Sequence, residues 1–400
     1  MKIHGIQTVI DNLKKILGVS SLSNINTLVE SAKQAEAEKD WSLAAELYEK
    51  ARDTEPKEAN WSYRLGLSLE RAKRFQESIS AYQRAIELKP KHEWWYRLGI
   101  SAEGAKDFVL VRKAHKESLK LKNNSDPLLL KLLEASPVGI NSRFKLLEYL
   151  RGKLPDLQKR VAENASIQSG EPNIFTYWDS GIEQAPVVVK ACIREMMNKH
   201  KPGKVSVIDA KNWKYYVDLP DHVLQKVPTN KAHFSDILRV ALLSKYGGIW
   251  ADATCMPSKD IGSIFNEITQ SGFFSYNYST ARISNWFLCT SGDNYIAKIM
   301  FEAMCDYWKD YNYALHYYFF HHIFEILYYL DERFHTIWDQ SKKASSKEPH
   351  AIQKMMLTDF DDTSFMNAYS ESAVHKLTYK FDESLLRSST VLAHVVRGFS

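Results

Sequence analysis

The 400-residue chain is predicted to contain an all-α domain of helical repeats followed by an α/β domain with a mostly parallel sheet. Two observations predict this arrangement. Early in the chain, Tyr48 and Pro56 recur 34 residues later as Tyr82 and Pro90, and a period of this length is typical of stacked helical repeats. From residue 173 onward, short β-rich runs alternate with helical ones, which predicts parallel strands joined by helices.

The repeat units are expected to be pairs of antiparallel helices. Small residues let two helices approach closely, an aromatic residue fills the gap between them, and a proline stops the second helix. The recurring positions are Ala44, Tyr48, Ala51 and Pro56, repeated as Ser78, Tyr82, Ala85 and Pro90, and Trp61, Leu65 and Gly66, repeated as Trp94, Leu98 and Gly99. This order of residues resembles the tetratricopeptide repeat (TPR), over residues 28–125. The resemblance implies a concave face for a protein partner or a polymer, although such a module can also simply pack on the neighbouring domain.

The composition is that of a globular protein and excludes several classes. Lys and Arg number 53 against 48 Asp and Glu, and the net charge of +5 is too dilute to indicate nucleic-acid binding. The four cysteines lie far apart with no zinc-type spacing, so we expect reduced thiols and a cytoplasmic protein. No apolar run approaches the roughly 20 residues of a membrane span. The motifs of dinucleotide-binding, P-loop and α/β-hydrolase enzymes are not present.

Residues 1–20 are predicted to form an amphipathic helix and not a signal peptide. Asp11, Lys14 and Lys15 interrupt any apolar core, and no small-residue cleavage site follows. The apolar side would consist of Ile6, Val9, Ile10, Leu13, Ile16 and Leu17. Two interpretations stay open: the helix packs on the next domain, or it docks on an anionic membrane surface and holds the protein peripherally at the inner face of the cell membrane.

The remainder of the chain divides into a connector and the α/β domain. Residues 126–172 are expected to be a helical connector, after a polar break at 122–127. The α/β domain is expected over residues 173–400. Its predicted strands are 174–178, 205–209, 249–251, 272–276 and 285–289, and its predicted helices are 187–199, 235–246, 295–309 and 315–334.

Acidic residues, Asp209 and Asp252, end two of these strands. Ligands of such sheets bind beyond the carboxyl ends of the strands, so both acids are candidates to hold a ribose hydroxyl or a metal ion, although an acid there can also cap the next helix. Asp236 and Arg239 are three residues apart and share one face of a helix. The glycine pair that ends this helix would return the chain to the sheet, so that Asp252 approaches that face.

Residues 235–254, SDILRVALLSKYGGIWADAT, resemble the core signature of the capsular polysaccharide synthesis proteins and of related glycosyltransferases with a DXD motif. Three further segments follow the order of that family: FTYWDSGIEQAP at 175–186, SNWFL at 284–288 and HKLTYK at 375–380. The resemblance spans residues 173–381. It implies a GT-A fold that takes a sugar from a nucleotide-sugar donor, expected to be a UDP-sugar, and passes it to a glycan or lipid-linked glycan acceptor.

The resemblance also implies which residues bind the donor. Trp178, with Tyr177 beside it, would stack on the base. Asp236 and Arg239 would hold the donor sugar and, with Asp252, make up the expected catalytic set. The other expected donor contacts are Asp209 at its strand end and Lys376 or Lys380 on the diphosphate.

A divalent cation, Mn²⁺ or Mg²⁺, is the cofactor that the resemblance implies. Asp252 matches the first acid of the DXD motif and would bind ribose and the metal. The position of the second acid is Thr254, a neutral hydroxyl that binds divalent cations more weakly than a carboxylate. His375 would be the third metal ligand and would repair part of that loss.

The expected function is therefore sugar transfer in the synthesis of a bacterial capsular or other surface polysaccharide, with the retained anomeric configuration of the related families. The alternative is a catalytically degenerate transferase, with Thr254 marking lost metal binding, that acts as a TPR scaffold for a polysaccharide-assembly complex. A degenerate enzyme would have no need to keep the five expected site residues in place, which are Trp178, Asp236, Arg239, Asp252 and His375.

Removal of residues 1–20 tests their role at a membrane. If this segment docks on lipid, the full chain will sediment with liposomes that contain anionic lipid and the shortened chain will sediment less, because it has lost an apolar side and basic charge. Neutral liposomes are the control for charge. Equal sedimentation of the two chains would contradict membrane docking and favour packing on the next domain.

Overall fold

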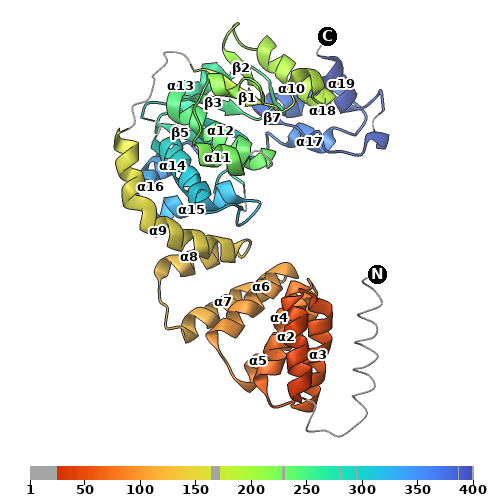
Figure 1. Ribbon diagram of the computed structural model, residues 1–400. Coiled ribbons are helices and arrows are strands. Elements are labelled where there is room, and N and C mark those ends of the chain that lie inside the picture. Colours follow the sequence, from red (N-terminus) through yellow and green to blue (C-terminus); the bar gives the residue numbers. More distant parts are fainter. Residues whose placement is uncertain are drawn as a thin grey trace. The chain divides into compact units, whose positions relative to one another are not determined.

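The computed structural model describes residues 25–163, 172–227, 230–278, 282–293, 295–385 and 387–398 (Figure 1). The chain divides into two compact units, Met1–Asn141 and Ser142–Ser400. The amphipathic helix predicted for residues 1–20 lies outside the described residues, so the choice between its two interpretations stays open.

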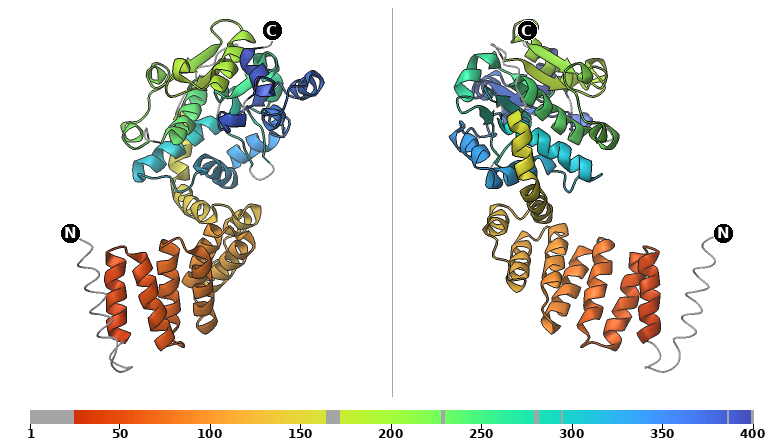
Figure 2. Two further views of the ribbon diagram at one scale, coloured as in Figure 1. Left: turned by 90° about the vertical axis from the view of Figure 1, so that its right-hand side faces the viewer. Right: turned by 60° about the vertical axis from the view of Figure 1, so that its left-hand side comes forward.

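The first unit consists of helices that stack side by side in sequence order (Figure 2). They are α2 (Ile25–Ala37), α3 (Trp41–Thr54), α4 (Ala59–Arg71), α5 (Phe75–Leu88), α6 (His92–Gly104), α7 (Phe108–Leu121) and α8 (Pro127–Ala135). The same left-handed turn recurs before α3, α5 and α7, where Lys39, Lys73 and Lys106 adopt φ of 61°, 60° and 62°. This recurrence confirms the predicted helical repeat.

Small residues set the distance between the helices of a pair. A Cβ atom at Gly66 in α4 would stand 2.7 Å from two ring carbons of Tyr82 in α5. Gly99 in α6 has the same relation to His115 in α7, where a Cβ would stand 2.6 Å from Nε2. The Ser78 hydroxyl donates to the Gly66 carbonyl oxygen at 2.8 Å. These close contacts explain why glycine recurs at positions 66 and 99 and why position 78 carries a small residue.

A five-stranded sheet forms the centre of the second unit, with the strand order β2-β1-β3-β6-β5. The strands are β1 (Ile174–Tyr177), β2 (Val205–Ile208), β3 (Gly248–Ala251), β5 (Phe273–Ser275) and β6 (Phe287–Thr290). β1 pairs in parallel with β2 and β3, whereas β6 runs antiparallel to both β3 and β5. Every strand of this sheet except β6 therefore runs in one direction, which confirms the predicted mostly parallel sheet.

Helices cover both faces of this sheet, chiefly α10 (Val187–Asn198) and α12 (Lys231–Tyr246). On one face, Met196 of α10 packs with Ile174 and Ile249. On the other face, Tyr246 of α12 contacts Phe175, with ring centroids 5.8 Å apart. Because successive strand side chains point to opposite faces, neighbouring residues of β1 reach different helices.

A second, two-stranded sheet pairs β4 (Cys255–Pro257) with β7 (Val374–Lys376) in antiparallel orientation. The register sets Cys255 opposite Lys376 and Met256 opposite His375. β4 begins shortly after Asp252, so this small sheet brings a segment from late in the chain to the carboxyl end of β3.

The other elements surround this core. They are α9 (Ile140–Glu163), η1 (Ile182–Gln184), η2 (Trp213–Tyr215), α11 (Asp221–Lys226), η3 (Ile261–Ile264), α13 (Phe265–Ile268), α14 (Tyr295–Asp310), α15 (Phe319–Leu330), α16 (Glu332–Gln340), α17 (Ala351–Met355), α18 (Asp362–Ser370), η4 (Glu383–Leu385) and α19 (Val391–Arg397). In the predicted connector, Arg160 of α9 pairs with Glu302 and Asp306 of α14 at 2.7 and 2.8 Å. None of the helices in the described ranges is long and apolar enough to cross a membrane.

Substitution of Gly66 by valine tests the close approach of α4 and α5. The new side chain meets the Tyr82 ring, so we expect the free energy of unfolding to fall by about 1–3 kcal/mol, as for other overpacked cores. Urea unfolding followed by far-UV circular dichroism measures this change. Gly152→Ala is the control, because no side chain or distant backbone atom lies within 4 Å of a Cβ at that position of α9. An unchanged unfolding midpoint for Gly66→Val would contradict the packing described.

Candidate active site

Asp252 follows β3 at its carboxyl end, where a glycine pair has returned the chain from α12. Gly248 adopts φ +90°, and a Cβ there would stand 2.5 Å from the carbonyl oxygen of Asn173, so glycine is required for β3 to start beside β1. Gly247 also has positive φ, at 65°. The Asp252 amide then donates to the carbonyl oxygen of Trp286 at 2.8 Å. The glycine pair thus returns the chain to the sheet in the way the sequence predicts.

Asp236 and Arg239 lie beside Asp252, in the middle of α12, which begins at Lys231 and not at residue 235 as predicted. Arg239 Nη2 is 3.1 Å from Asp236 Oδ1 and 3.8 Å from Asp252 Oδ1. The side-chain amide of Asn285 donates to Asp236 Oδ1 at 2.9 Å, and its backbone carbonyl oxygen accepts from Arg239. The structure therefore brings the three predicted residues together. It adds Asn285, which the sequence analysis did not identify as a site residue although it lies within the SNWFL segment at 284–288.

Two aromatic rings lie against the guanidinium of Arg239. The residue as a whole is buried, with 5% of its surface exposed. The guanidinium carbon lies 5.1 Å from the ring centroid of Trp250 and 5.7 Å from that of Phe320. Trp250 also donates its indole N–H to Asp252 Oδ1 at 2.9 Å. Because a buried cation is costly to leave unpaired, Arg239 is a fixed positive charge that depends on Asp236 and Asp252.

Lys376 of β7 reaches the same place from the other side. Its Nζ donates to Asp252 Oδ2 and to the Thr254 hydroxyl oxygen, both at 2.7 Å. The side chains of Asp252 and Lys376 stay partly open, with exposed fractions of 27% and 18%. Asp252 is therefore the acid of this cluster that a ligand can reach.

The charges of this pair stabilise each other. Burial alone would raise the pKa of Asp252, but Lys376 and Arg239 hold it below its ordinary value. Burial would likewise lower the pKa of Lys376, but the nearby Asp252 carboxylate holds it above its ordinary value. Both groups are therefore ionised at neutral pH.

His375 does not join this cluster. It precedes Lys376 in β7, so its side chain points to the opposite face of the strand. There it is fully buried, donates from Nε2 to the carbonyl oxygen of Tyr369 at 3.0 Å and stacks on the Tyr369 ring. Of the three expected metal ligands, the structure thus brings together Asp252 and Thr254.

These two oxygen ligands do not make a donor set that fits a divalent cation. Mg²⁺ and Mn²⁺ favour carboxylate and other oxygen ligands, and this site offers one carboxylate and one neutral hydroxyl, both already bound by Lys376. Among the residues that the structure describes, no group of three or more His, Cys, Asp or Glu side chains could hold a metal ion. The predicted metal site stays a prediction.

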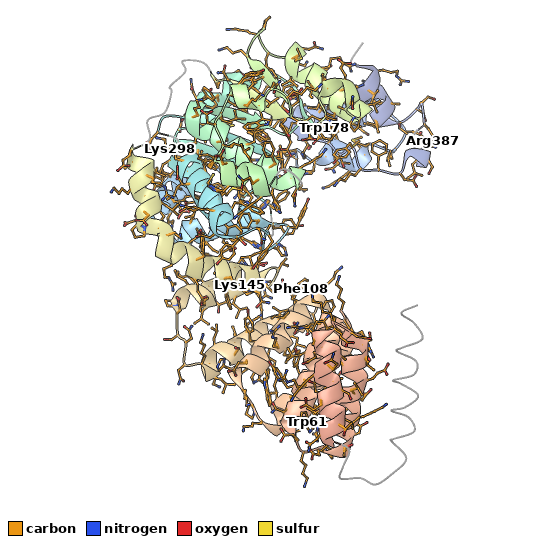
Figure 3. The ribbon with its side chains drawn as sticks, viewed as in Figure 1. Trp61, Phe108, Lys145, Trp178, Lys298 and Arg387 are labelled. Atoms are coloured by element: carbon orange, nitrogen blue, oxygen red, sulfur yellow. The ribbon has the colours of Figure 1, made fainter. Side chains whose placement is uncertain are left out.

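Trp178 lies directly after β1 (labelled in Figure 3). It is half-buried and meets Tyr379 edge to face, with ring centroids 5.1 Å apart. It also packs on the cluster that contains Val189 and Ala253, so it adjoins the segment between Asp252 and Thr254. Lys380 is exposed beside Tyr379, with its Nζ 5.7 Å from that ring centroid.

Tyr177 and Asp209 make local contacts at the ends of β1 and β2. Tyr177 is buried and donates its hydroxyl to Asp179 at 2.8 Å. Asp209 Oδ1 accepts from the backbone amides of Lys211 and Asn212 at 2.8 and 2.9 Å, which caps the turn after β2. Asp209 therefore caps a turn, whereas Asn212 precedes the next helical element, η2, and a donor contact stays a prediction.

The fold and the position of these residues define the class of protein. A mostly parallel sheet covered by helices on both faces, with its cluster of charged residues beyond the carboxyl end of β3, is the architecture of an α/β domain that binds its ligand at this edge of the sheet.

The chain belongs to the capsular polysaccharide synthesis protein family, whose model matches residues 138–395. A tetratricopeptide repeat model matches residues 31–93. Among solved structures, a mutant of the O-GlcNAc transferase of Thermobaculum terrenum is similar with 14% sequence identity and a TM-score of 0.27, over 48% of this chain and 38% of that chain. No curated protein matches the chain.

Replacement of Arg239 by methionine tests the buried charge cluster. The change leaves Asp236, 6% exposed, without its cation, so we expect the free energy of unfolding to fall by about 3–5 kcal/mol. Urea unfolding followed by tryptophan fluorescence measures it. The double variant Asp236→Asn with Arg239→Met is the control and should recover part of the loss, because no unpaired carboxylate remains. Equal stability of Arg239→Met and the wild type would contradict this account.

Proposed function

We propose that this chain transfers a sugar from a nucleotide sugar to a glycan in the synthesis of a bacterial capsular or other surface polysaccharide. The observation that carries the proposal is the convergence of Asp236, Arg239 and Asp252 at the carboxyl end of β3, where sheets of this kind bind their ligands. Membership of the capsular polysaccharide synthesis protein family supports the product class. The donor is a UDP-sugar and the acceptor is a glycan or a lipid-linked glycan.

Each site residue has a role in this proposal. The half-exposed Trp178 stacks on the donor base, with Tyr379 holding its ring from the edge. Asp252, the reachable acid, accepts hydrogen bonds from ribose and sugar hydroxyls. Asp236 and Arg239, which are almost fully buried, border the sugar, and Arg239 also pairs with Asp252.

The remaining predicted residues act around this charged cluster. Tyr177 and Asp209 shape the strand ends beside Trp178 through their local hydrogen bonds. Lys380 and Lys376 supply positive charge for the diphosphate. Both come from the segment at and after β7, so that segment serves the leaving group.

The reaction exchanges one bond for another. The bond between the anomeric carbon and the diphosphate oxygen breaks, and its electron pair stays on the nucleoside diphosphate. The acceptor hydroxyl oxygen bonds to the anomeric carbon, and its proton passes to the released diphosphate. Attack from the side of the leaving group retains the anomeric configuration. Preorganised positive charge lowers the barrier because negative charge develops on the diphosphate.

Exposed tyrosines between α14 and α15 are candidates for the acceptor site. Tyr311, Tyr313, Tyr317 and Tyr318 are exposed by 37%, 54%, 72% and 47%. Flat aromatic faces stack on sugar rings and carry a polar hydroxyl for hydrogen bonding. These side chains suit an extended glycan.

A protein partner on the repeats is compatible with this activity. Val109 of α7 is 79% exposed and Leu121 is 43% exposed, and repeats of this kind commonly present binding surfaces. The scaffold alternative needs no donor site. It is disfavoured because Asp236, Arg239 and Asp252 remain joined by ion pairs and hydrogen bonds, an arrangement that a scaffold without a donor site would not need.

A thermal-shift panel tests the donor site. Nucleoside diphosphates and nucleotide sugars are added to the wild type, to Asp252→Ala and to Asp218→Ala, in which an exposed acid elsewhere is removed. A ligand at 100 times its dissociation constant adds about 2.7 kcal/mol of stability. We expect a shift for UDP and UDP-sugars in the wild type and in Asp218→Ala, and a much smaller one in Asp252→Ala. Absence of any shift in the folded wild type would favour the scaffold.

A further inference from the structure

We propose that the ammonium group of Lys376 takes the place of a divalent cation at the donor diphosphate, so that sugar transfer by this chain needs no metal ion. The inference rests on the proposed function. Its basis is the position of Lys376 Nζ, which is 2.7 Å from the Asp252 carboxylate and 2.7 Å from the Thr254 hydroxyl.

The two oxygen atoms that a metal would use are already bound. A divalent cation in a phosphate site is commonly held by one or two carboxylates together with the phosphates. Here the second acidic side chain of the cluster, Asp236, is engaged by Arg239 and Asn285. Only Asp252 is left as a charged ligand, and Lys376 occupies its Oδ2.

The charge balance agrees with a lysine in this position. Two carboxylates and a divalent cation sum to zero charge, and so do one carboxylate and one ammonium. The neutral side chain of Thr254 is therefore consistent with a lysine at position 376. If position 254 carried a second carboxylate beside Lys376, the site would have one excess negative charge. The Thr254 hydroxyl still contributes to the site, because it accepts a hydrogen bond from the Lys376 ammonium and so orients that group.

Lys376 is held by the backbone and is not a mobile surface lysine. It lies in β7 opposite Cys255 of β4. Its amide donates to the Pro349 carbonyl oxygen at 2.8 Å, and the Leu377 amide donates to the Thr254 carbonyl oxygen at 2.9 Å. These bonds fix the Cα position of Lys376 relative to the segment from Asp252 to Thr254, as a built-in cation requires.

The ammonium still has a donor available for the substrate. It carries three N–H groups, of which two point to Asp252 and Thr254. Its side chain is 18% exposed, so the third can meet a phosphate oxygen. As the bond to the anomeric carbon breaks, its electron pair stays on the diphosphate, and the fixed positive charge of Lys376 stabilises the negative charge that develops there.

Calorimetric titration of UDP tests the inference on the full chain, once in buffer with EDTA and once with MnCl₂. We expect wild-type dissociation constants that agree within about twofold in the two buffers. Binding that EDTA abolishes and Mn²⁺ restores would overturn the inference while leaving the proposed function intact. Absence of UDP binding in both buffers would overturn the proposed UDP donor, and the inference with it.

Variants of the two positions sharpen the test. Lys376→Met should weaken UDP binding by about 10- to 100-fold in both buffers, and Lys376→Arg should keep most of it. Lys259→Met, which removes an exposed lysine, is the control and should not change binding. Combining Lys376→Met with Thr254→Asp creates a second carboxylate and should make UDP binding dependent on Mn²⁺. Melting curves verify that each variant is folded. If Lys376→Met binds UDP as the wild type does, the inference is wrong.

Discussion

The site depends on one ion pair, between Asp252 and Lys376, which joins two segments 124 residues apart. A carboxylate removed from water costs free energy unless a cation compensates it, and this one is met by Lys376 on one side and by Arg239 on the other. The glycine pair admits β3 beside β1, and the pairing of β4 with β7 delivers the lysine. The charges are therefore arranged before any ligand arrives, which is the condition for stabilising charge that develops during a reaction.

Local patterns predicted a large part of the fold and of the site. The repeat, the alternation of strands and helices and the glycine pair are all readable over short stretches of sequence. Asp236 and Arg239 could be assigned to one side of α12 because a spacing of three residues fixes their relation within a helix. Asp252 could be added because it stands immediately after a strand.

Features set by distant pairing could not be predicted. His375 and Lys376 are adjacent in sequence, and which of them faces Asp252 is decided by the register of β7 against β4; a shift of one residue would exchange them. Asn285 reaches Asp236 only because β6 lies next to β3. A turn-capping acid such as Asp209 and a ligand-binding acid look alike in sequence, since the difference lies in which hydrogen bonds are already made.

The late position of β7 has a consequence for biosynthesis. A ribosome that adds about 5–20 residues per second reaches Lys376 roughly 6 to 25 seconds after Asp252. During that interval the nascent chain has its strand-end acid and Arg239 but not its lysine, and the two-stranded sheet cannot form. Completion of the charged cluster is thus coupled to translation past Lys376, and a polypeptide truncated before that residue would lack the partner of Asp252.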